Sequence, residues 1–409
     1  MTIPAPTRTR TARLLGVDAA RGIALIGMMA VHVTPSLTPD GEVSTAYVLA
    51  SGRASALFAV LAGVGLALAS GGRTPPRGRA LWAVCLSTTA RAGVLLVVGL
   101  AVGVFESGVA VILAYYGLLF LVAVPFLGLG PKILLPLAVV WTIVTPVISQ
   151  ALRWGTAWES PGNPTFESLG DPAGLLGDLV LTGYYPVLQW TAYLLLGLGL
   201  GRLDLRAARV PGLLLAGGVA LAITARLTSW VLLEAGGLAQ LREAGAGGHP
   251  ITGRPLDVAL QTSFFGTTPT TSWWWLAISA PHSAAPADLL HTMGTAVAVL
   301  GLMLLIARGL GRALWPLAAI GSMTLTLYSL HVILLATALP RETPHVLLVH
   351  VVVALVVAIP WRAFVGRGPL EAVAARAAAA AGASVMGRRD AVTGSSPPHQ
   401  QRQAGDHQG

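Results

Sequence analysis

Residues 14–32 read LLGVDAARGIALIGMMAVH, an apolar run long enough to form a helix across a membrane. A helix needs about twenty mainly apolar residues to cross the ~30 Å of hydrocarbon in a bilayer. Runs of this kind recur along the 409-residue chain, of which only 11% is charged, whereas soluble domains are about 25% charged. We therefore expect an all-α, polytopic helical bundle that spans the lipid bilayer of the cell (plasma) membrane many times.

Ten runs have the length and apolar character of a membrane span. They cover residues 14–36, 47–70, 81–104, 109–129, 132–150, 182–201, 210–233, 288–308, 313–338 and 344–364. If there are ten spans, all the arginine-rich connectors lie on the same side of the membrane as the N-terminus. The connector that holds Lys132 lies on this side too. Basic connectors face the cytoplasm, so we expect both termini there. An eleventh span or a re-entrant segment within 234–287, which contains the interfacial-type sequence Trp273, Trp274 and Trp275, is left open.

The remaining sequence divides into tails and loops. Residues 1–13 are a basic cytoplasmic tail, 14–372 the membrane domain with long outer loops at about 151–181 and 234–287, and 373–409 a mostly disordered cytoplasmic tail. The net charge of +9 is spread over the connectors, which argues against nucleic acid as a partner. The chain has one cysteine, which excludes an internal disulfide and a cysteine-based zinc site. It has no dense set of carboxylates, so we expect no metal.

The first span carries three ionisable side chains, which are costly at membrane depth and usually face a cavity or a partner. Asp18 and Arg21 are three residues apart and can pair on one helix face. Arg21 and His32 also share a face, about 20° apart around the helix and ~16 Å apart along it. Arg21 would hold an anionic group from the cytoplasm, and His32 would take a proton from an acceptor hydroxyl or amine. The alternative is a structural ion pair with an interfacial histidine.

Several polar groups fall at the outer level of other spans. Arg53 opens the second span, His291 the eighth, and His331 lies in the ninth, one turn from Tyr328. If the bundle brings these helices together with His32, they form a pocket rich in histidine and arginine. Each could instead be a residue that only anchors its helix at the interface.

Two features lie deeper in the spans. Arg91 is near the middle of the third span, where we expect it to pair with Asp18 or to bind a cofactor phosphate. Small residues allow helices to pack closely in membranes. We expect this role for the glycines of the second and sixth spans, namely Gly63, Gly65, Gly197, Gly199 and Gly201.

Several motifs together resemble one group of membrane proteins. The start D-A-A-R-G at 18–22 resembles the first span of heparan-α-glucosaminide N-acetyltransferase-like and YeiB-like proteins. Four more stretches look like members of that group: S-G-R-x-S at 51–55, G-Y-Y-P-x-L-x-W at 183–190, L-T-L-Y-S-L-H at 325–331 and G-P-L-E at 368–371. The resemblance covers the chain from about 14 to 372.

A second pattern, Arg21-x10-His32, is similar to the R-x10-H motif of the acyltransferase-3 family, in which acyl-CoA enters from the cytoplasm and the acceptor is a sugar or lipid headgroup outside. The resemblances imply that acetyl-CoA or another acyl-CoA is the donor substrate. Heparan-type enzymes have their active histidine after the first span, whereas residues 33–50 here contain none. Either His32 takes that role or the chemistry differs. Our candidates are, for catalysis, His32, His331 and His291; for the donor, Arg21, Arg91 and Asp18; for the acceptor, Arg53 and Tyr328.

The sequence thus predicts an integral membrane acyltransferase that moves an acetyl or other short acyl group from cytoplasmic acyl-CoA to an extracytoplasmic glycan or glycolipid. Two alternatives stay open: a transporter or flippase for an anionic lipid or glycan intermediate, and a non-catalytic partner in envelope assembly. The transporter has less support because no internal repeat is visible. The oligomeric state is open, with a homodimer as the ordinary expectation.

Overall fold

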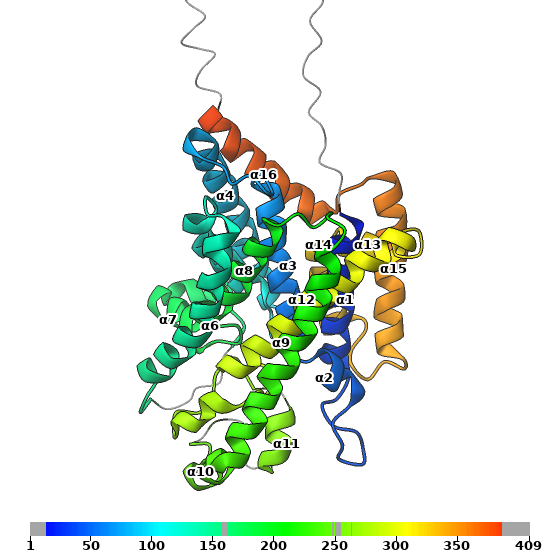
Figure 1. Ribbon diagram of the computed structural model, residues 1–409. Helices are drawn as coiled ribbons and strands as arrows, with labels where there is room; N and C mark the ends of the chain where they lie inside the picture. The colour runs from blue at the N-terminus through cyan, green and yellow to red at the C-terminus, as the bar shows by residue number, and fades with distance from the viewer. Residues whose placement is uncertain (1–13, 157–161, 248, 250–254, 263, 387–409) are drawn as a thin grey trace, which may run out of the picture.

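The computed structural model describes residues 14–156, 162–247, 249, 255–262 and 264–386. Within these residues the regular structure is helical, apart from one isolated bridge between Leu37 and Val43. The first helix, α1 (Leu15–Val33), begins at the same end of the bundle at which the last, α16 (Pro369–Met386), ends (Figure 1). The all-α class expected from the apolar runs is confirmed.

Each of the ten expected spans contains a helix or a pair of helices. After α1 they are α2 (Thr45–Ala50) with α3 (Arg53–Ala69), α4 (Gly78–Gly103), α5 (Leu113–Ala123), α6 (Pro131–Leu152), α8 (Val187–Gly201), α9 (Val210–Leu232), α12 (Pro286–Gly309), α13 (Trp315–Gly321) with α14 (Thr324–Thr337), and α15 (Val346–Phe364).

Seven helical segments in the described residues are long and apolar enough to cross a membrane. An eighth is added if α13 and α14, which meet at 78°, form one broken span. The helices α5 and α8 are apolar but shorter. The structure therefore supports a multi-pass membrane protein, while the count of ten and the side on which the termini lie remain predictions from the sequence.

The short helix α8 lies in the centre of the bundle, and nearly all of its side chains are buried. It packs closely on α3 through glycines. A methyl group on Gly197 would overlap the carbonyl oxygen of Val60, and one on Gly63 would overlap that of Leu194. The expected role of these two glycines in helix packing is confirmed. Gly199 faces Leu135 of α6 instead.

The break between α13 and α14 leaves backbone N–H groups at the start of α14 without partners inside the helix. The Glu371 carboxylate of α16 serves as the hydrogen-bond acceptor for these N–H groups. It accepts hydrogen bonds from the N–H groups of Leu325 at 2.7 Å and Thr326 at 3.2 Å, and from the Thr326 hydroxyl at 2.6 Å. The G-P-L-E stretch at 368–371 therefore joins the C-terminal helix to the broken span.

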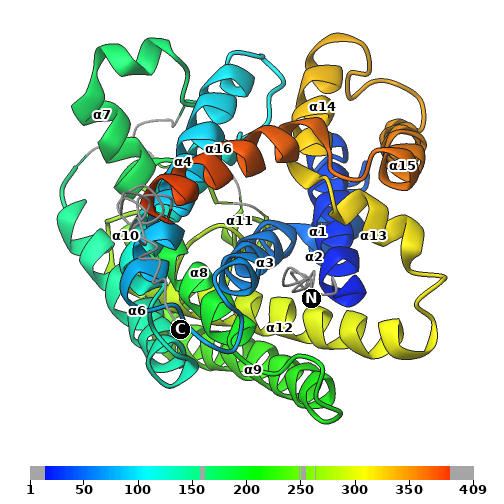
Figure 2. The same cartoon turned by 90° about the horizontal axis from the view of Figure 1, so that it is seen from above.

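The start of the expected disordered tail is corrected by α16. We expected disorder from residue 373, but the helix continues to Met386. It packs along α4, where the Ser87 hydroxyl donates to the carbonyl oxygen of Ala378 and Arg79 donates to that of Val385, each at 2.8 Å. Its alanines allow α16 to approach α4 closely. The low complexity of the same sequence had indicated a disordered tail. Figure 2 shows α16 crossing this end of the bundle between α4 and α14. The rest of the expected tail, and the N-terminal tail at 1–13, lie outside the described residues.

The opposite end of the bundle is covered by the second of the two long loops. The first contains α7 (Pro172–Gly177), and the second contains α10 (Leu238–Ala244) and α11 (Leu256–Gln261). Figure 1 shows α10 and α11 at the end away from α16. The second loop has a small core of its own around Phe264, Trp275 and Ile278. In the described part of the open segment 234–287, the helices between α9 and α12 are only a few residues long, so none of them is by itself an eleventh span.

Candidate functional site

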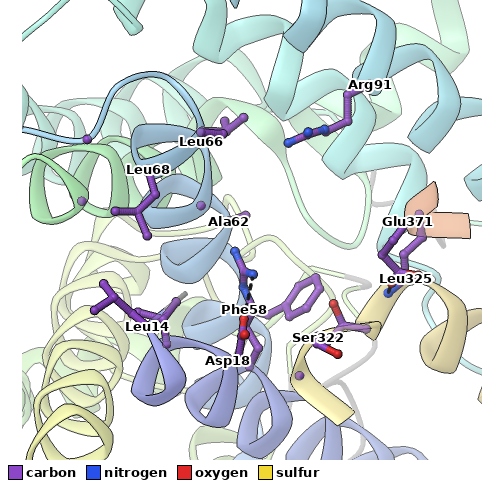
Figure 3. Close-up of a pocket in the computed structure, with 18 of the residues that line it drawn as sticks. Leu14, Asp18, Phe58, Ala62, Leu66, Leu68, Arg91, Ser322, Leu325 and Glu371 are labelled. Carbon is purple, nitrogen blue, oxygen red and sulfur yellow. Dashed lines mark hydrogen bonds and ion pairs between the residues drawn. The ribbon is translucent and has the colours of Figure 1, made fainter. Parts of the chain in front are cut away.

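A pocket of about 920 Å³ opens at the α16 end of the bundle. Its walls come from α1, α3, α4, α5, the α13–α14 break and the start of α16. Figure 3 shows Asp18 on α1 and Arg91 on α4 approaching this space from different sides, with Glu371 of α16 at a third. A volume of this size is typical of sites for small molecules and cofactors.

The polar part of the lining is mostly cationic. Five arginines contribute to it against three carboxylates, and all three carboxylates are already engaged, Asp18 with Arg21 at 3.6 Å. Asp204 binds Arg73 at 3.0 Å, and Glu371 caps α14. The lining arginines are Arg21, Arg73, Arg91, Arg206 and Arg367. Because guanidinium groups bind phosphate and carboxylate groups well, this pocket is suited to an anionic ligand.

Arg21 is fixed by three neighbours. Its Nη1 lies 3.6 Å from an Asp18 carboxylate oxygen, and its Nη2 donates to the carbonyl oxygen of Leu61 at 3.2 Å. A methyl group on Gly65 would overlap Nη2. Gly65 therefore makes room for the guanidinium, and the packing role expected for it is replaced by this contact. The ion pair expected between Asp18 and Arg21 is present.

Arg91 does not pair with Asp18, which was one of two partners expected for it. It reaches the pocket from the middle of α4, and no hydrogen bond or ion pair to its guanidinium is found among the described residues. The charged groups that act on it are Arg21 and Arg367. A cation whose charged neighbours are cations is well placed to bind an anion.

Part of the pocket lining is apolar and aromatic. Phe58, Leu113 and Tyr116 belong to it, and the rings of Phe58 and Tyr116 are in contact with centroids 5.2 Å apart. The Tyr116 hydroxyl is buried, and no hydrogen-bond partner for it is found in the described part of the chain. A buried hydroxyl without a partner is costly, which makes it a candidate contact for a ligand.

A second polar feature lies near the other end of α1. Nδ1 of His32 is 3.1 Å from Nε2 of His331, and Nδ1 of His331 is 3.0 Å from Nδ1 of His350. Nε2 of His350 donates to the carbonyl oxygen of Leu339 at 3.2 Å. We refer to His32, His331, His350 and the Leu339 carbonyl as the histidine chain. It brings together His32 and His331, as expected, and adds His350.

His350 was missed from the sequence. It lies near the start of the last expected span, at the same outer level as His331, so the span positions contained a signal for it. The signal was weak because nothing in the sequence shows that α15 lies beside α14. In the structure the His331 and His350 side chains are almost completely buried, each at 2% exposure.

Tyr328 stands between the histidine chain and the pocket. Its ring lies edge-on to His32 with centroids 6.1 Å apart. Its hydroxyl accepts from the N–H of Ile112 at 3.3 Å and donates to the carbonyl oxygen of Ala110 at 3.4 Å. Ile112 precedes Leu113, a pocket residue. The pocket lining contains no histidine, so a layer of side chains separates the two features.

The expected convergence of all the outer residues is only partly correct. Arg53 donates to Nε2 of His291 at 3.2 Å, and Nδ1 of His291 bonds the carbonyl oxygen of Ala222 at 3.0 Å. Both ring nitrogens of His291 are thus engaged away from His32, because α12 packs on α9 and α3. His291 is therefore placed with Arg53 in a separate pair, although the sequence grouped it with His32 and His331.

His282 lies in a loop beside Gly52, the residue that precedes Arg53. Its Nε2 accepts a hydrogen bond from the N–H of Gly52 at 3.2 Å. Burial lowers the pKa of His282 to about 4, so the imidazole is neutral and can accept this bond. In the described residues no group of three or more His, Cys, Asp or Glu side chains has an arrangement that could hold a metal ion.

A protein-family model described as heparan-alpha-glucosaminide N-acetyltransferase, catalytic, matches residues 13–216. The match includes Asp18, Arg21, His32, Arg53 and Arg91, and it ends before α12. A search of curated proteins finds no match.

Proposed function

The chain belongs to the heparan-alpha-glucosaminide N-acetyltransferase-like family over residues 13–216, and from this premise we propose that it is a membrane acyltransferase. The donor is acetyl-CoA or another short acyl-CoA, which binds in the arginine-lined pocket. The acceptor is a hydroxyl or amine of a glycan or glycolipid at the His32 end of α1. The pocket end faces the cytoplasm and the histidine end faces outward.

The observation that carries this proposal is the arginine pocket at one end of α1. CoA carries phosphate groups at one end and a long, narrow, uncharged arm at the other. The pocket lining offers a match to both, with Arg21 and Arg91 among its charged residues and Phe58 and Tyr116 among its apolar and aromatic residues. Arg91 is the best candidate for a phosphate contact because its guanidinium has no anionic partner among the described residues.

The chemistry requires a base near the acceptor. In the proposed reaction His32 removes the proton from the acceptor as its oxygen or nitrogen bonds the acyl carbon. The bond between that carbon and the CoA sulfur breaks, and the thiolate receives the proton from His32. His331 holds the His32 ring through the 3.1 Å hydrogen bond. Tyr328 packs against the same ring, which restricts its orientation.

The acyl group must pass the side-chain layer between the pocket and the histidine chain. Arg21 and His32 are ~16 Å apart along α1, so the arm of the donor has to reach inward from the phosphate contacts. It would enter beside Phe58 and Tyr116, where the unpartnered Tyr116 hydroxyl can bond an amide or the thioester carbonyl. We therefore assign Tyr116 to the donor as well, a residue that the sequence did not single out.

Binding and transfer measured separately test the proposal. Purified protein is titrated with radiolabelled acetyl-CoA and assayed with glycan and glycolipid acceptors. Arg91→Gln should weaken binding, whereas His32→Ala should bind acetyl-CoA normally and transfer nothing. Arg209→Gln is the matched control, because Arg209 is an exposed arginine just before α9 that does not line the pocket. If the wild-type protein does not bind acetyl-CoA at millimolar concentration, the acyltransferase proposal is wrong and transport of an anionic intermediate gains support.

A further inference from the structure

Three imidazoles and one backbone carbonyl form a single hydrogen-bonded row. The atoms in order are Nδ1 of His32, Nε2 and Nδ1 of His331, Nδ1 and Nε2 of His350, and the carbonyl oxygen of Leu339. The three links measure 3.1, 3.0 and 3.2 Å. Two of the rings are almost fully buried, so the row is not interrupted by bulk water.

The Leu339 carbonyl fixes every proton in this row. A carbonyl oxygen can only accept, so Nε2 of His350 carries a hydrogen. A neutral imidazole has one N–H, and therefore Nδ1 of His350 accepts and Nδ1 of His331 donates. By the same reasoning Nε2 of His331 accepts and Nδ1 of His32 donates. For neutral rings this is the only arrangement that satisfies all three links, and it leaves Nε2 of His32 without a proton.

We propose that His350 and the Leu339 carbonyl are positioning elements that set the tautomer of His32, so that its Nε2 is the free base nitrogen. Neither element touches the reacting atoms. Their effect is passed through His331, in the way that a third group orients the base in other nucleophilic sites. The tautomer assignment stands on the hydrogen bonds alone. Its consequence for catalysis rests on the function proposed above.

The loop that supplies the carbonyl is held against α1 itself. The N–H of Leu339 donates to the carbonyl oxygen of Leu334 at 2.7 Å. Two residues later, Arg341 donates from Nε to the carbonyl oxygen of His32 at 2.7 Å and from Nη2 to that of Gly108 at 2.8 Å. Arg341 therefore ties the loop to the residue whose tautomer the loop controls. Arg341 thereby holds both ends of the histidine chain, His32 and the Leu339 carbonyl, in place relative to each other.

Nitrogen NMR of the reconstituted protein tests the assignment directly. The protein carries ¹⁵N-histidine in liposomes, and His32→Ala, His331→Ala and His350→Leu assign the signals. In the wild type, His32 and His331 should be protonated at Nδ1, the minor form of free histidine, and His350 at Nε2. Protonation of His32 at Nε2 in the wild type would overturn the proposal. Because no acyl transfer is needed, this result is independent of whether the proposed activity is correct.

A pair of substitutions at His350 tests the catalytic consequence. The amide of His350→Gln can accept from Nδ1 of His331 and donate to Leu339, whereas His350→Leu can do neither. In His350→Leu nothing fixes the tautomer of His331, which is free to donate from Nε2. Nδ1 of His32 must then accept, and this forces the proton of His32 onto Nε2, the nitrogen that should act as the base. Loss of a general base costs about 10²- to 10⁴-fold, so we expect a fall of that order in kcat with KM for acetyl-CoA unchanged.

The Gln variant should retain most of the activity. Equal losses in the Gln and Leu variants, with acetyl-CoA bound normally by both, would contradict the positioning role, as would full activity in the Leu variant. If His350→Leu does not fold, the NMR result on the wild type decides the assignment. If the wild type shows the expected tautomers but no acyl transfer, the proposed function is wrong and the tautomer assignment remains.

Discussion

Nη2 of Arg21 occupies the space directly over Gly65, so that a methyl group at position 65 would overlap it. The two residues belong to α1 and α3, and the contact holds the guanidinium at the edge of the pocket. A glycine in the middle of a helix costs roughly 1 kcal/mol relative to alanine. Its presence here is explained by the arginine it accommodates.

Gly65→Ala should therefore weaken acetyl-CoA binding without unfolding the protein. The far end of a flexible side chain can move, but Arg21 would then lose its bond to the Leu61 carbonyl. A displaced guanidinium would also lose its bond to a donor phosphate. Hydrogen bonds of charged groups contribute about 1.5 to 3 kcal/mol, so Kd should rise about 10-fold or more. Gly93→Ala on α4 is the control, because Gly93 has open space around it. Equal affinities in the two variants would show that Arg21 does not bind the donor.

Tyr116→Phe should separate stability from activity. The Tyr116 hydroxyl is buried and unpartnered in the described structure, so removing it should leave thermal stability unchanged or slightly increased. If the hydroxyl bonds the donor arm, kcat/KM for acetyl-CoA should fall roughly 10-fold, as expected for one lost hydrogen bond. Unchanged kcat/KM would remove Tyr116 from the donor path, and a large loss of stability would show that the hydroxyl has a structural partner.

Arg202 is near the pocket but should be purely structural. It is buried at the end of α8, and its guanidinium donates to four backbone carbonyls, including those of Ala67 at 3.1 Å and Leu127 at 2.6 Å. Arg202→Gln would leave several of these carbonyls unpaired, at about 1 to 3 kcal/mol each. We expect a large fall in the midpoint of thermal unfolding, with Arg209→Gln unaffected. A stable Arg202→Gln protein with reduced acetyl-CoA binding would contradict this assignment.

Stability should fall as the pH is lowered from about 6.5 to about 4, in part because of His282. Its folded pKa of about 4 lies below the ordinary histidine value of 6.5, so the unfolded state binds more protons in this range. The contribution of His282 is therefore complete above pH 6.5 and is lost as the pH falls towards 4. A protonated ring could not accept the Gly52 N–H.

His282→Gln tests this origin. The variant should show a flatter dependence of the unfolding midpoint on pH than the wild type. The control is His345→Asn, since His345 is exposed and has a positive φ of 52°, which asparagine tolerates. If the pH dependence of His282→Gln equals that of the wild type, the loss of stability arises elsewhere.

The sequence correctly predicted the all-α class of the fold and the positions of the ionisable side chains along α1. Apolar runs identified every helix that corresponds to an expected span, and helical spacing placed Asp18 beside Arg21. The same spacing put His32 at the far end of the helix. These inferences depend only on local geometry, which a single helix determines by itself.

Relations between helices were harder to predict. His331 was expected near His32, but His350 was not, because its partner comes from α14 and the contact depends on how α15 packs. The sequence grouped His291 with His32 and His331 because the position of His291 along its span shows its depth in the membrane. That position does not show the direction in which the side chain points. The helix α16 was read as a tail because alanine-rich sequence does not show that Ser87 and Glu371 contacts hold it against the bundle.

Transfer across a sealed vesicle tests the central claim most directly. The protein is reconstituted with a glycan acceptor inside the vesicles, and radiolabelled acetyl-CoA is added outside to molecules whose arginine pocket faces outward. The account predicts acetylated acceptor inside the vesicles for the wild type, and none for His32→Ala, which still binds acetyl-CoA. Acetylated acceptor formed equally by His32→Ala, or formed only when acceptor and acetyl-CoA share one side, would contradict it.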